Sequence, residues 1–204
     1  MLEETGVDRL YKEFKTLIEY IEQGNEISLR NTVDENFRKA LLLSAASYFE
    51  HRITNDILEY MGEISNKNEL LVSFVSNKAI SRQYHTYFNW KDTNANSFFG
   101  LFGDIFSNFI KQEVKNSEHL SSSIKAFLEI GRERNRLVHQ DFGTFSLEKT
   151  SDEIYLLYKD ALVFVNVLPD KLRQCLQKNE AEKIGTEIYF SVPIKKRANR
   201  YLYG

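Results

Sequence analysis

The chain has 204 residues, of which 42% are hydrophobic and 27% charged, and its 27 basic and 29 acidic side chains leave a formal net charge of −2. These values fit one medium globular domain with a substantial core. Because the charges nearly balance, the chain as a whole is not basic enough to attract nucleic acid or an anionic membrane, and any basic surface must be local. A single cysteine excludes an intramolecular disulfide framework, and neither a signal-peptide pattern nor a membrane-length apolar run is present, so we expect a cytoplasmic protein without membrane association.

The first element expected is an amphipathic helix over residues 8–23. Its apolar residues recur at steps of three and four, namely Leu10, Phe14, Leu17, Ile18 and Ile21. Because the chain has only two prolines and its nine glycines are scattered, long helices are favoured over a turn-rich β fold. The composition and the periodicity together predict an all-α fold.

A long helix is expected next, from Val33 to about Ile64. Thr32 and Glu35 have the spacing of a capping box that would begin it, and no proline interrupts the run. Within this helix Glu50 falls on an otherwise apolar stripe. A carboxylate in that position is expected to have a polar or charged partner.

The middle of the chain predicts shorter elements. Residues 70–90 are expected to form a helix or a helix pair with a weak point at Ser76, followed by a loop and a helix over about 104–115. The aromatic residues of this region favour core or dimer packing over stacking on bases. They are Tyr84, Tyr87, Phe88, Trp90, Phe98, Phe99, Phe102, Phe106 and Phe109.

The last part of the chain contains a helix that begins near Ile124, a loop over 141–150 and a second capping box, formed by Thr150 and Glu153. The helix that follows is expected to kink or end at Pro169. Residues 186–192 have the composition of a strand, and the cations after them either hold phosphates or are simply solvated. We therefore predict one helical domain over 1–180 and an extended basic tail over 181–204.

Metal and phosphate-loop chemistry have little support in the sequence. The histidines are far apart and no cysteine cluster accompanies them, which predicts no zinc site and no other metal or cofactor. Gly100 and Gly103 lack the lysine and the strand–glycine–helix context of a phosphate-binding loop, and no Gly-x-Ser-x-Gly elbow is present.

The stretch GRERNRLVHQDF, residues 131–142, is the strongest candidate for chemistry. At about 100° per residue, Asn135 and His139 share a helix face, whereas Arg134 and His139 lie about 140° apart. Arg134 therefore needs its long side chain, a distorted last turn or a second copy of the helix to act beside His139. A two-fold dimer axis would bring two arginines and two histidines around one groove.

These residue types suit RNA cleavage without a metal. An imidazole can take a proton from a ribose 2′-hydroxyl or give one to the leaving 5′-oxygen, an arginine can neutralise charge on the phosphorane, and an asparagine can orient either group. The alternative is a solvated, arginine-rich helix end that carries an incidental histidine.

The run from Arg134 to His139 resembles the Arg-Asn-x-x-x-His motif of the HEPN superfamily, small α-helical proteins that dimerise and often act as metal-independent ribonucleases. Two further stretches, LLLSAASYFEHRI at 41–53 and SNKAISRQYHTYFNWKDTNANSFFGLFG at 76–103, are similar to the RiboL-PSP type, which is associated with bacterial defence or toxin systems. The resemblance covers about residues 33–168.

The resemblance implies that Arg134 and His139 form the catalytic pair, that Asn135 organises them, and that Glu50 supports the site. Arg132 and Arg136 are expected to assist substrate binding. The resemblance also implies an antiparallel helical bundle that forms a homodimer. It further implies an RNA substrate, a partner such as an antitoxin, and products with a 2′,3′-cyclic phosphate and a 5′-hydroxyl.

Toxin relatives paired with a nucleotidyltransferase antitoxin often carry a tyrosine shortly after the histidine, whereas here Gln140, Asp141 and Phe142 follow it. Regulation by modification of such a tyrosine is therefore not expected. Two other interpretations stay open: a non-catalytic HEPN module that binds RNA, nucleotide or protein, and a structural dimer in which Arg134 and Glu50 form a buried ion pair.

Overall fold

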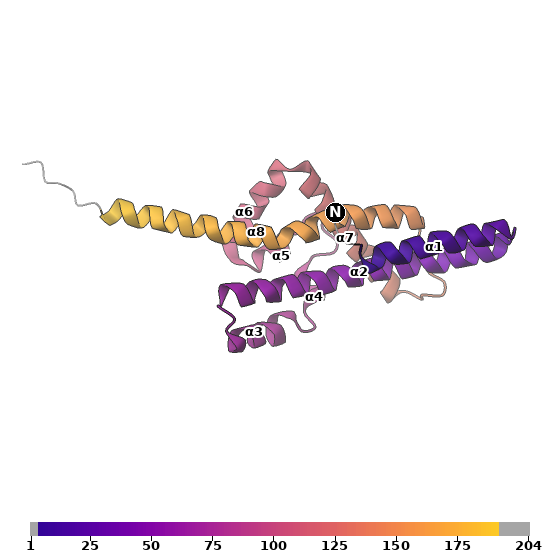
Figure 1. The fold of residues 1–204 in the computed structure, drawn as a ribbon, viewed down its shortest axis with the longest axis horizontal. Helices are drawn as coiled ribbons and strands as arrows, with labels where there is room; N and C mark the ends of the chain where they lie inside the picture. The colour runs from indigo at the N-terminus through magenta and orange to yellow at the C-terminus, as the bar shows by residue number, and fades with distance from the viewer. Residues whose placement is uncertain (1–3, 192–204) are drawn as a thin grey trace, which may run out of the picture.

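The computed structural model describes the backbone of residues 4–191 and the side chains of residues 4–181. Every regular element in the described part is helical, which confirms the all-α prediction (Figure 1). In chain order the elements are α1 (Gly6–Gln23), α2 (Ile27–Ile64), α3 (Glu69–Val75), the π-helix η1 (Ser76–Ile80), α4 (Tyr84–Tyr87), α5 (Asn96–Gly100), α6 (Gly103–Asn116), α7 (Glu118–His139) and α8 (Ser151–Ser191).

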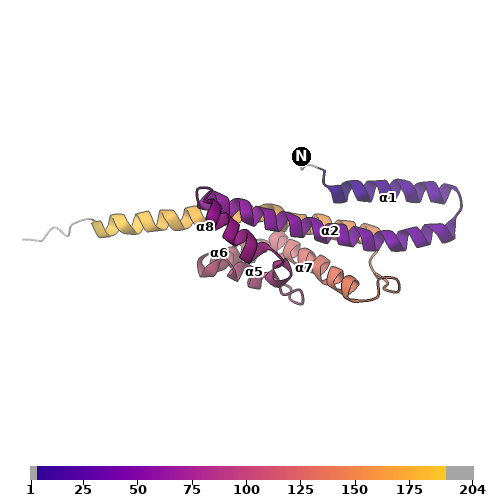
Figure 2. The ribbon, with the colours of Figure 1, turned by 90° about the horizontal axis from the view of Figure 1, so that it is seen from below.

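The helices α1 and α2 form an antiparallel hairpin that extends beyond the rest of the bundle (Figure 2). Phe14 on α1 stacks on Phe37 on α2 with the ring centroids 3.5 Å apart. The start of α1 is capped by Thr5 and Asp8, whose side chains bond each other's backbone N–H groups. The start of α2 packs against α1 in this hairpin. The helix α2 accordingly begins at Ile27, six residues before the expected start at Val33.

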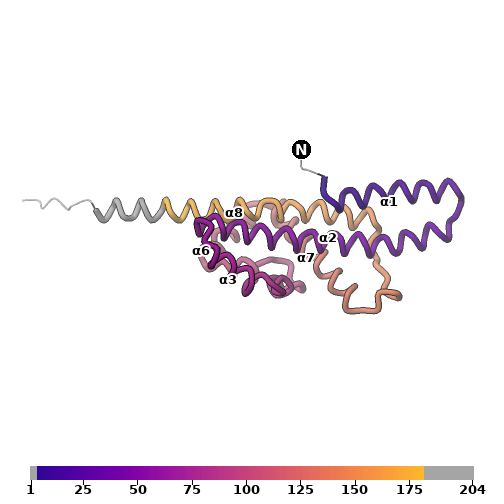
Figure 3. The backbone as a smooth tube through the Cα atoms, turned by 60° about the horizontal axis from the view of Figure 1, so that its bottom comes forward, coloured from indigo at the N-terminus to yellow at the C-terminus, as the bar shows by residue number. Residues whose placement is uncertain are grey.

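The core lies where α2, α7 and α8 pack together (Figure 3). Phe49 of α2 is 5.5 Å from the ring of Phe127 on α7 and 5.4 Å from that of Tyr158 on α8, measured between centroids. All three side chains are almost completely buried. Burial of large aromatic groups contributes strongly to such a core, because each removes a large apolar area from water.

The segment from α3 to α6 covers one side of this core. The break expected at Ser76 is confirmed, because α3 ends at Val75 and a π-helical turn follows. Core packing of the aromatic cluster is also confirmed: Tyr87, Phe88, Phe98, Phe99 and Phe106 are buried.

Two predictions about element boundaries are wrong. Thr32 does not begin a helix; it lies inside α2, where its hydroxyl donates to the Ser28 carbonyl. At the C-terminus, neither the strand expected over 186–192 nor the extended tail expected from residue 181 is present as far as Ser191, because α8 continues through Pro169 to that residue. Val192 and the four cations that follow the expected strand (Lys195, Lys196, Arg197 and Arg200) lie outside the described residues.

The capping box at Thr150 is confirmed. The Glu153 carboxylate accepts from the Thr150 backbone N–H at 2.7 Å, and the Thr150 hydroxyl accepts from the Glu153 N–H at 3.2 Å. No helix within residues 4–191 is long and apolar enough to cross a membrane.

Candidate active site

A cavity of about 390 Å³ opens between α2, α7 and the segment around α4. Its inner walls are apolar and aromatic, with contributions from Phe49, Phe127 and Trp90. Its polar lining comes from all three parts of the chain. The volume lies in the range of small-ligand sites, and the mixture of apolar walls with a few polar groups is typical of them.

Four of the residues singled out from the sequence meet at this cavity: Glu50 from α2, and Arg134, Asn135 and His139 from α7. The Arg134 guanidinium donates to the Asn135 side-chain oxygen at 3.1 Å. Glu50 is exposed, and within residues 4–181 neither it nor Arg134 takes part in an ion pair. The buried Arg134–Glu50 ion pair of the purely structural interpretation is therefore not formed in the described chain.

Arg134 and His139 line one cavity within a single chain, although they are five residues apart on α7. Asn135 and His139 share a helix face, as expected from the helical repeat. The long Arg134 side chain also contributes to the cavity lining, and it donates there to the side chain of the neighbouring Asn135. A second copy of α7 is not required to bring the arginine and the histidine together.

Arg132 and Arg136 do not line the cavity. Both form ion pairs with Glu133, at 3.8 Å and 2.9 Å respectively. The Arg136 guanidinium also lies over the Phe145 ring, 5.5 Å from its centroid. Both arginines therefore make their contacts outside the cavity, with Glu133 and, for Arg136, with the loop after α7.

The sequence interpretation did not single out Arg82 and His85 as functional residues, yet both line the cavity. Arg82 has a left-handed backbone, with φ of +60°, directly after the π-helical turn and Ser81. A left-handed backbone is uncommon for residues other than glycine, and π turns are frequent at functional sites. Neither feature leaves a periodic signal in the sequence.

Trp90 closes one wall of the cavity against α7. Its indole N–H donates to the His85 carbonyl at 3.1 Å, and its ring lies so close to Gly131 that a Cβ on that residue would overlap it. Glycine is therefore required on α7 at this point. The tryptophan in turn holds the backbone of His85 beside the cavity.

The pKa of Tyr84, which lines the cavity, is shifted by two opposite charges in the same lining. Burial raises the pKa of its phenol, the Glu50 carboxylate raises that pKa further, and the Arg134 guanidinium opposes the increase. Both charges therefore act on the same phenol group. At neutral pH the tyrosine is a neutral hydrogen-bonding group between a carboxylate and a guanidinium.

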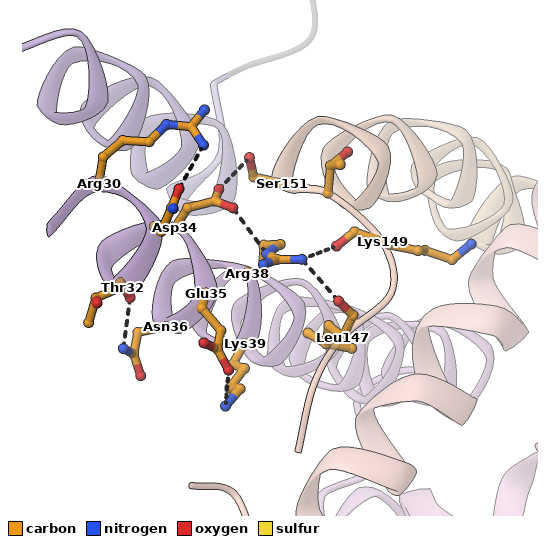
Figure 4. Close-up of polar contacts among 12 residues, drawn as sticks. Arg30, Thr32, Asp34, Glu35, Asn36, Arg38, Lys39, Leu147, Lys149 and Ser151 are labelled. Atoms are coloured by element: carbon orange, nitrogen blue, oxygen red, sulfur yellow. Dashed lines mark hydrogen bonds and ion pairs between the residues drawn. The ribbon is translucent and has the colours of Figure 1, made fainter. Parts of the chain in front are cut away.

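The loop that follows His139 is tied to α2 (Figure 4). Arg38 donates to the carbonyl oxygens of Leu147 and Lys149, at 2.9 and 3.4 Å, and its guanidinium also pairs with Asp34. Lys39, only 2% exposed, donates to the Phe142 carbonyl at 2.9 Å. The end of α7 that carries His139 is therefore connected to a fixed loop.

Within the described residues, no group of three His, Cys, Asp or Glu side chains is arranged to hold a metal ion. The sequence profile of the RiboL-PSP-HEPN family matches residues 8–174. No curated protein and no solved structure gives a significant match. The match covers the whole cavity and most of the chain, so this protein belongs to the RiboL-PSP-HEPN family.

Proposed function

We propose that the chain is a metal-independent endoribonuclease and that the cavity is its active site. The observation that carries this proposal is the convergence of Arg134, Asn135 and His139 on one cavity beside Glu50, in a member of a HEPN family. Arg134 has no carboxylate partner within residues 4–181, so its charge is available to a phosphate.

In the proposed reaction the ribose 2′-oxygen attacks the adjacent phosphorus and the bond to the 5′-oxygen breaks. His139 exchanges a proton with one of these oxygens, and Arg134 stabilises the negative charge that builds on the phosphorane. Asn135 orients the Arg134 guanidinium through the hydrogen bond described above. The products are a 2′,3′-cyclic phosphate and a 5′-hydroxyl, and DNA is not cut because it lacks the nucleophile.

A homodimer is part of the proposal. Val138 and Phe142, at the end of α7 and in the loop after it, are 44% and 47% exposed. Large apolar side chains beside a polar motif favour coverage by another protein surface. A second copy would bury them and narrow the entrance to the cavity.

Family membership further supports a cytoplasmic role in bacterial defence or as a toxin with an antitoxin partner. We expect induced expression of the parent chain to arrest growth of a bacterial host, and the His139→Ala variant to be tolerated. Equal toxicity of both chains would count against the toxin role.

The test of the nuclease proposal is cleavage of total RNA in EDTA by the parent, His139→Ala and Arg134→Ala. His51→Ala is the matched control, because His51 is exposed on α2 outside the cavity. We expect the parent and the control to cut and the two cavity variants to lose at least about 100-fold in rate. Equal cleavage by all four proteins would refute the assignment.

The second candidate is a binding module that uses the same cavity without cleavage. The aromatic walls formed by Phe49, Phe127 and Trp90 favour it, since they can accommodate a base irrespective of any chemistry. Salt-dependent binding of RNA that stays intact in the EDTA assay would identify this function instead.

A further inference from the structure

The cavity contains a second arginine and a second histidine from the same chain. Arg134 and His139 come from α7, while Arg82 and His85 come from the residues between the π-helical turn and the end of α4. Two arginines and two histidines therefore surround one cavity in a single protomer.

The backbone around the second pair is fixed by local hydrogen bonds. The Ser81 N–H donates to the Ser76 carbonyl at 2.8 Å, which closes the π turn. The Tyr87 hydroxyl donates to the Ala79 carbonyl at 2.7 Å, and the Trp90 indole to that of His85. These hydrogen bonds lie on both sides of Arg82 and hold its backbone in the left-handed conformation. The backbone conformation in turn sets the direction of the Arg82 side chain.

The side chains of this pair are available to a ligand. Arg82 and His85 are both exposed, and within residues 4–181 neither side chain forms a hydrogen bond or an ion pair. His139 is likewise exposed and unbonded in the described chain. Unpaired cations and imidazoles that converge on a cavity are suited to an anionic, proton-exchanging substrate.

The charges around His85 favour phosphate. The titratable groups that share the cavity with it are Glu50 from α2, Arg82 and Tyr84 from its own segment, and Arg134 and His139 from α7. Tyr84 stays neutral, so two guanidinium groups face one carboxylate. The lining carries a positive excess even when both imidazoles are neutral.

We propose that His85 is the second proton-transfer residue of the RNA cleavage and that Arg82 binds a phosphate group of the substrate beside it. The inference rests on the proposed nuclease function. Cleavage requires one group to take the proton of the 2′-hydroxyl and another to give a proton to the 5′-oxygen as its bond to phosphorus breaks. His139 and His85, one neutral and one protonated, supply both steps within one chain.

The first test is the pH dependence of cleavage in EDTA by the parent, His85→Gln and the control His51→Gln. The parent and the control are expected to give a bell-shaped profile of kcat/KM. His85→Gln is expected to lose about 100-fold or more in kcat, together with one limb of the bell. An unchanged rate and two intact limbs would overturn the role of His85.

A sulfur-substituted substrate separates proton donation from a structural role. When sulfur replaces the bridging 5′-oxygen, the leaving group departs without a proton. The variant that lacks the general acid, either His85→Gln or His139→Gln, is then expected to cleave this substrate within about tenfold of the parent rate. Failure to rescue either variant would contradict the assignment of an imidazole pair.

The second test measures binding without cleavage, with a single-stranded DNA oligonucleotide that lacks the 2′-hydroxyl. Arg82→Gln keeps a non-glycine residue at the left-handed position and removes the charge. The slope of log K against log salt is expected to fall by about 0.7, the value for one phosphate contact on a single strand. Arg9→Gln, on the exposed face of α1, is the control, and equal slopes for both variants would overturn the role of Arg82.

The two proposals fail in different ways. If the parent itself cuts no RNA, the nuclease function and the role of His85 fall together, while the salt slope still decides the role of Arg82. If the parent cuts and His85→Gln cuts equally well, only the further inference is lost. Thermal melting of each variant, expected to match the parent, identifies losses caused by unfolding.

Discussion

The Trp90 ring lies directly against the backbone of Gly131, three residues before Arg134 on α7. This contact fixes the spacing between the segment that carries His85 and the helix that carries His139. The width of the cavity therefore depends on residue 131 being glycine, since the methyl group of an alanine there would overlap the Trp90 ring.

Gly131→Ala is expected to displace Trp90 and destabilise the fold by about 1–3 kcal/mol, because overpacking of a tight contact forces side chains or backbone to move. Trp90 is the only tryptophan in the chain, so its fluorescence emission should shift to the red as the ring moves toward water. Urea denaturation gives the change in stability. Gly62→Ala is the control, since a Cβ there meets nothing within 4 Å, and it should leave the emission unchanged.

Glu50→Gln is expected to separate binding from cleavage. The substitution removes a negative charge from the cavity, so an uncleavable oligonucleotide should bind roughly two- to fivefold more tightly. Cleavage should become slower, because Glu50 is proposed to support the site that it lines with Arg134 and His139. Fluorescence anisotropy and single-turnover kinetics measure the two effects, and weaker binding than in the exposed-surface control Glu19→Gln would refute this role for Glu50.

Lys39→Met is expected to release the loop after α7. The buried ammonium group donates to the Phe142 carbonyl and lies 5.1 Å from the centroid of its ring, so its loss leaves that carbonyl without a donor. We expect a loss of about 1–3 kcal/mol in the free energy of unfolding and faster proteolysis within residues 140–150. Lys125→Met, at an exposed position of α7, should change neither quantity.

Asp8 predicts an acid-sensitive contact between α1 and α8. Burial opposes ionisation, but hydrogen bonds from the Thr5 backbone, Tyr155 and Lys159 outweigh it and lower the pKa of this carboxyl from 3.8 to about 2. A lowered pKa stabilises the fold above pH 3.8, and that stabilisation is lost as the pH falls through 2.

The depressed pKa corresponds to about 2 kcal/mol at neutral pH. Asp8→Asn should therefore be less stable than the parent at pH 7, and the difference should shrink as the pH falls from about 4 to 2. Thermal melts over this range measure it. A constant difference between the two proteins would show that the contribution of Asp8 is not ionic.

The helices were predictable from the sequence where local pattern and tertiary packing agree. Thr150 and Glu153 form the expected capping box because a loop precedes them. Thr32 and Glu35 have the same spacing, but the stacking of Phe37 on Phe14 accompanies a hairpin that keeps the chain helical from Ile27. Likewise, β-branched and aromatic residues after residue 186 did not prevent α8 from continuing to Ser191.

The candidate site was predictable only on α7 and at Glu50. The motif residues are close in sequence, so helical periodicity places them together, whereas Arg82 and His85 reach the cavity through a π turn and a left-handed residue. The two arginines and two histidines expected around one groove belong to two copies of α7, and that groove stays a prediction. No periodic pattern relates residues 82–85 to residues 134–139, so the pair that lines this cavity in the same chain could not be found from the sequence.

The ties that hold the loop after α7 end on main-chain oxygens of Phe142, Leu147 and Lys149. Because main-chain oxygens accept these bonds, the bonds do not depend on which side chains the loop carries. Ser146 and Glu148 are exposed and their side chains form no hydrogen bond or ion pair within residues 4–181, so these positions can be exchanged without altering the path of the chain. The loop is thus a place where recognition of a partner can be redesigned, or can diverge, while the geometry of His139 stays the same.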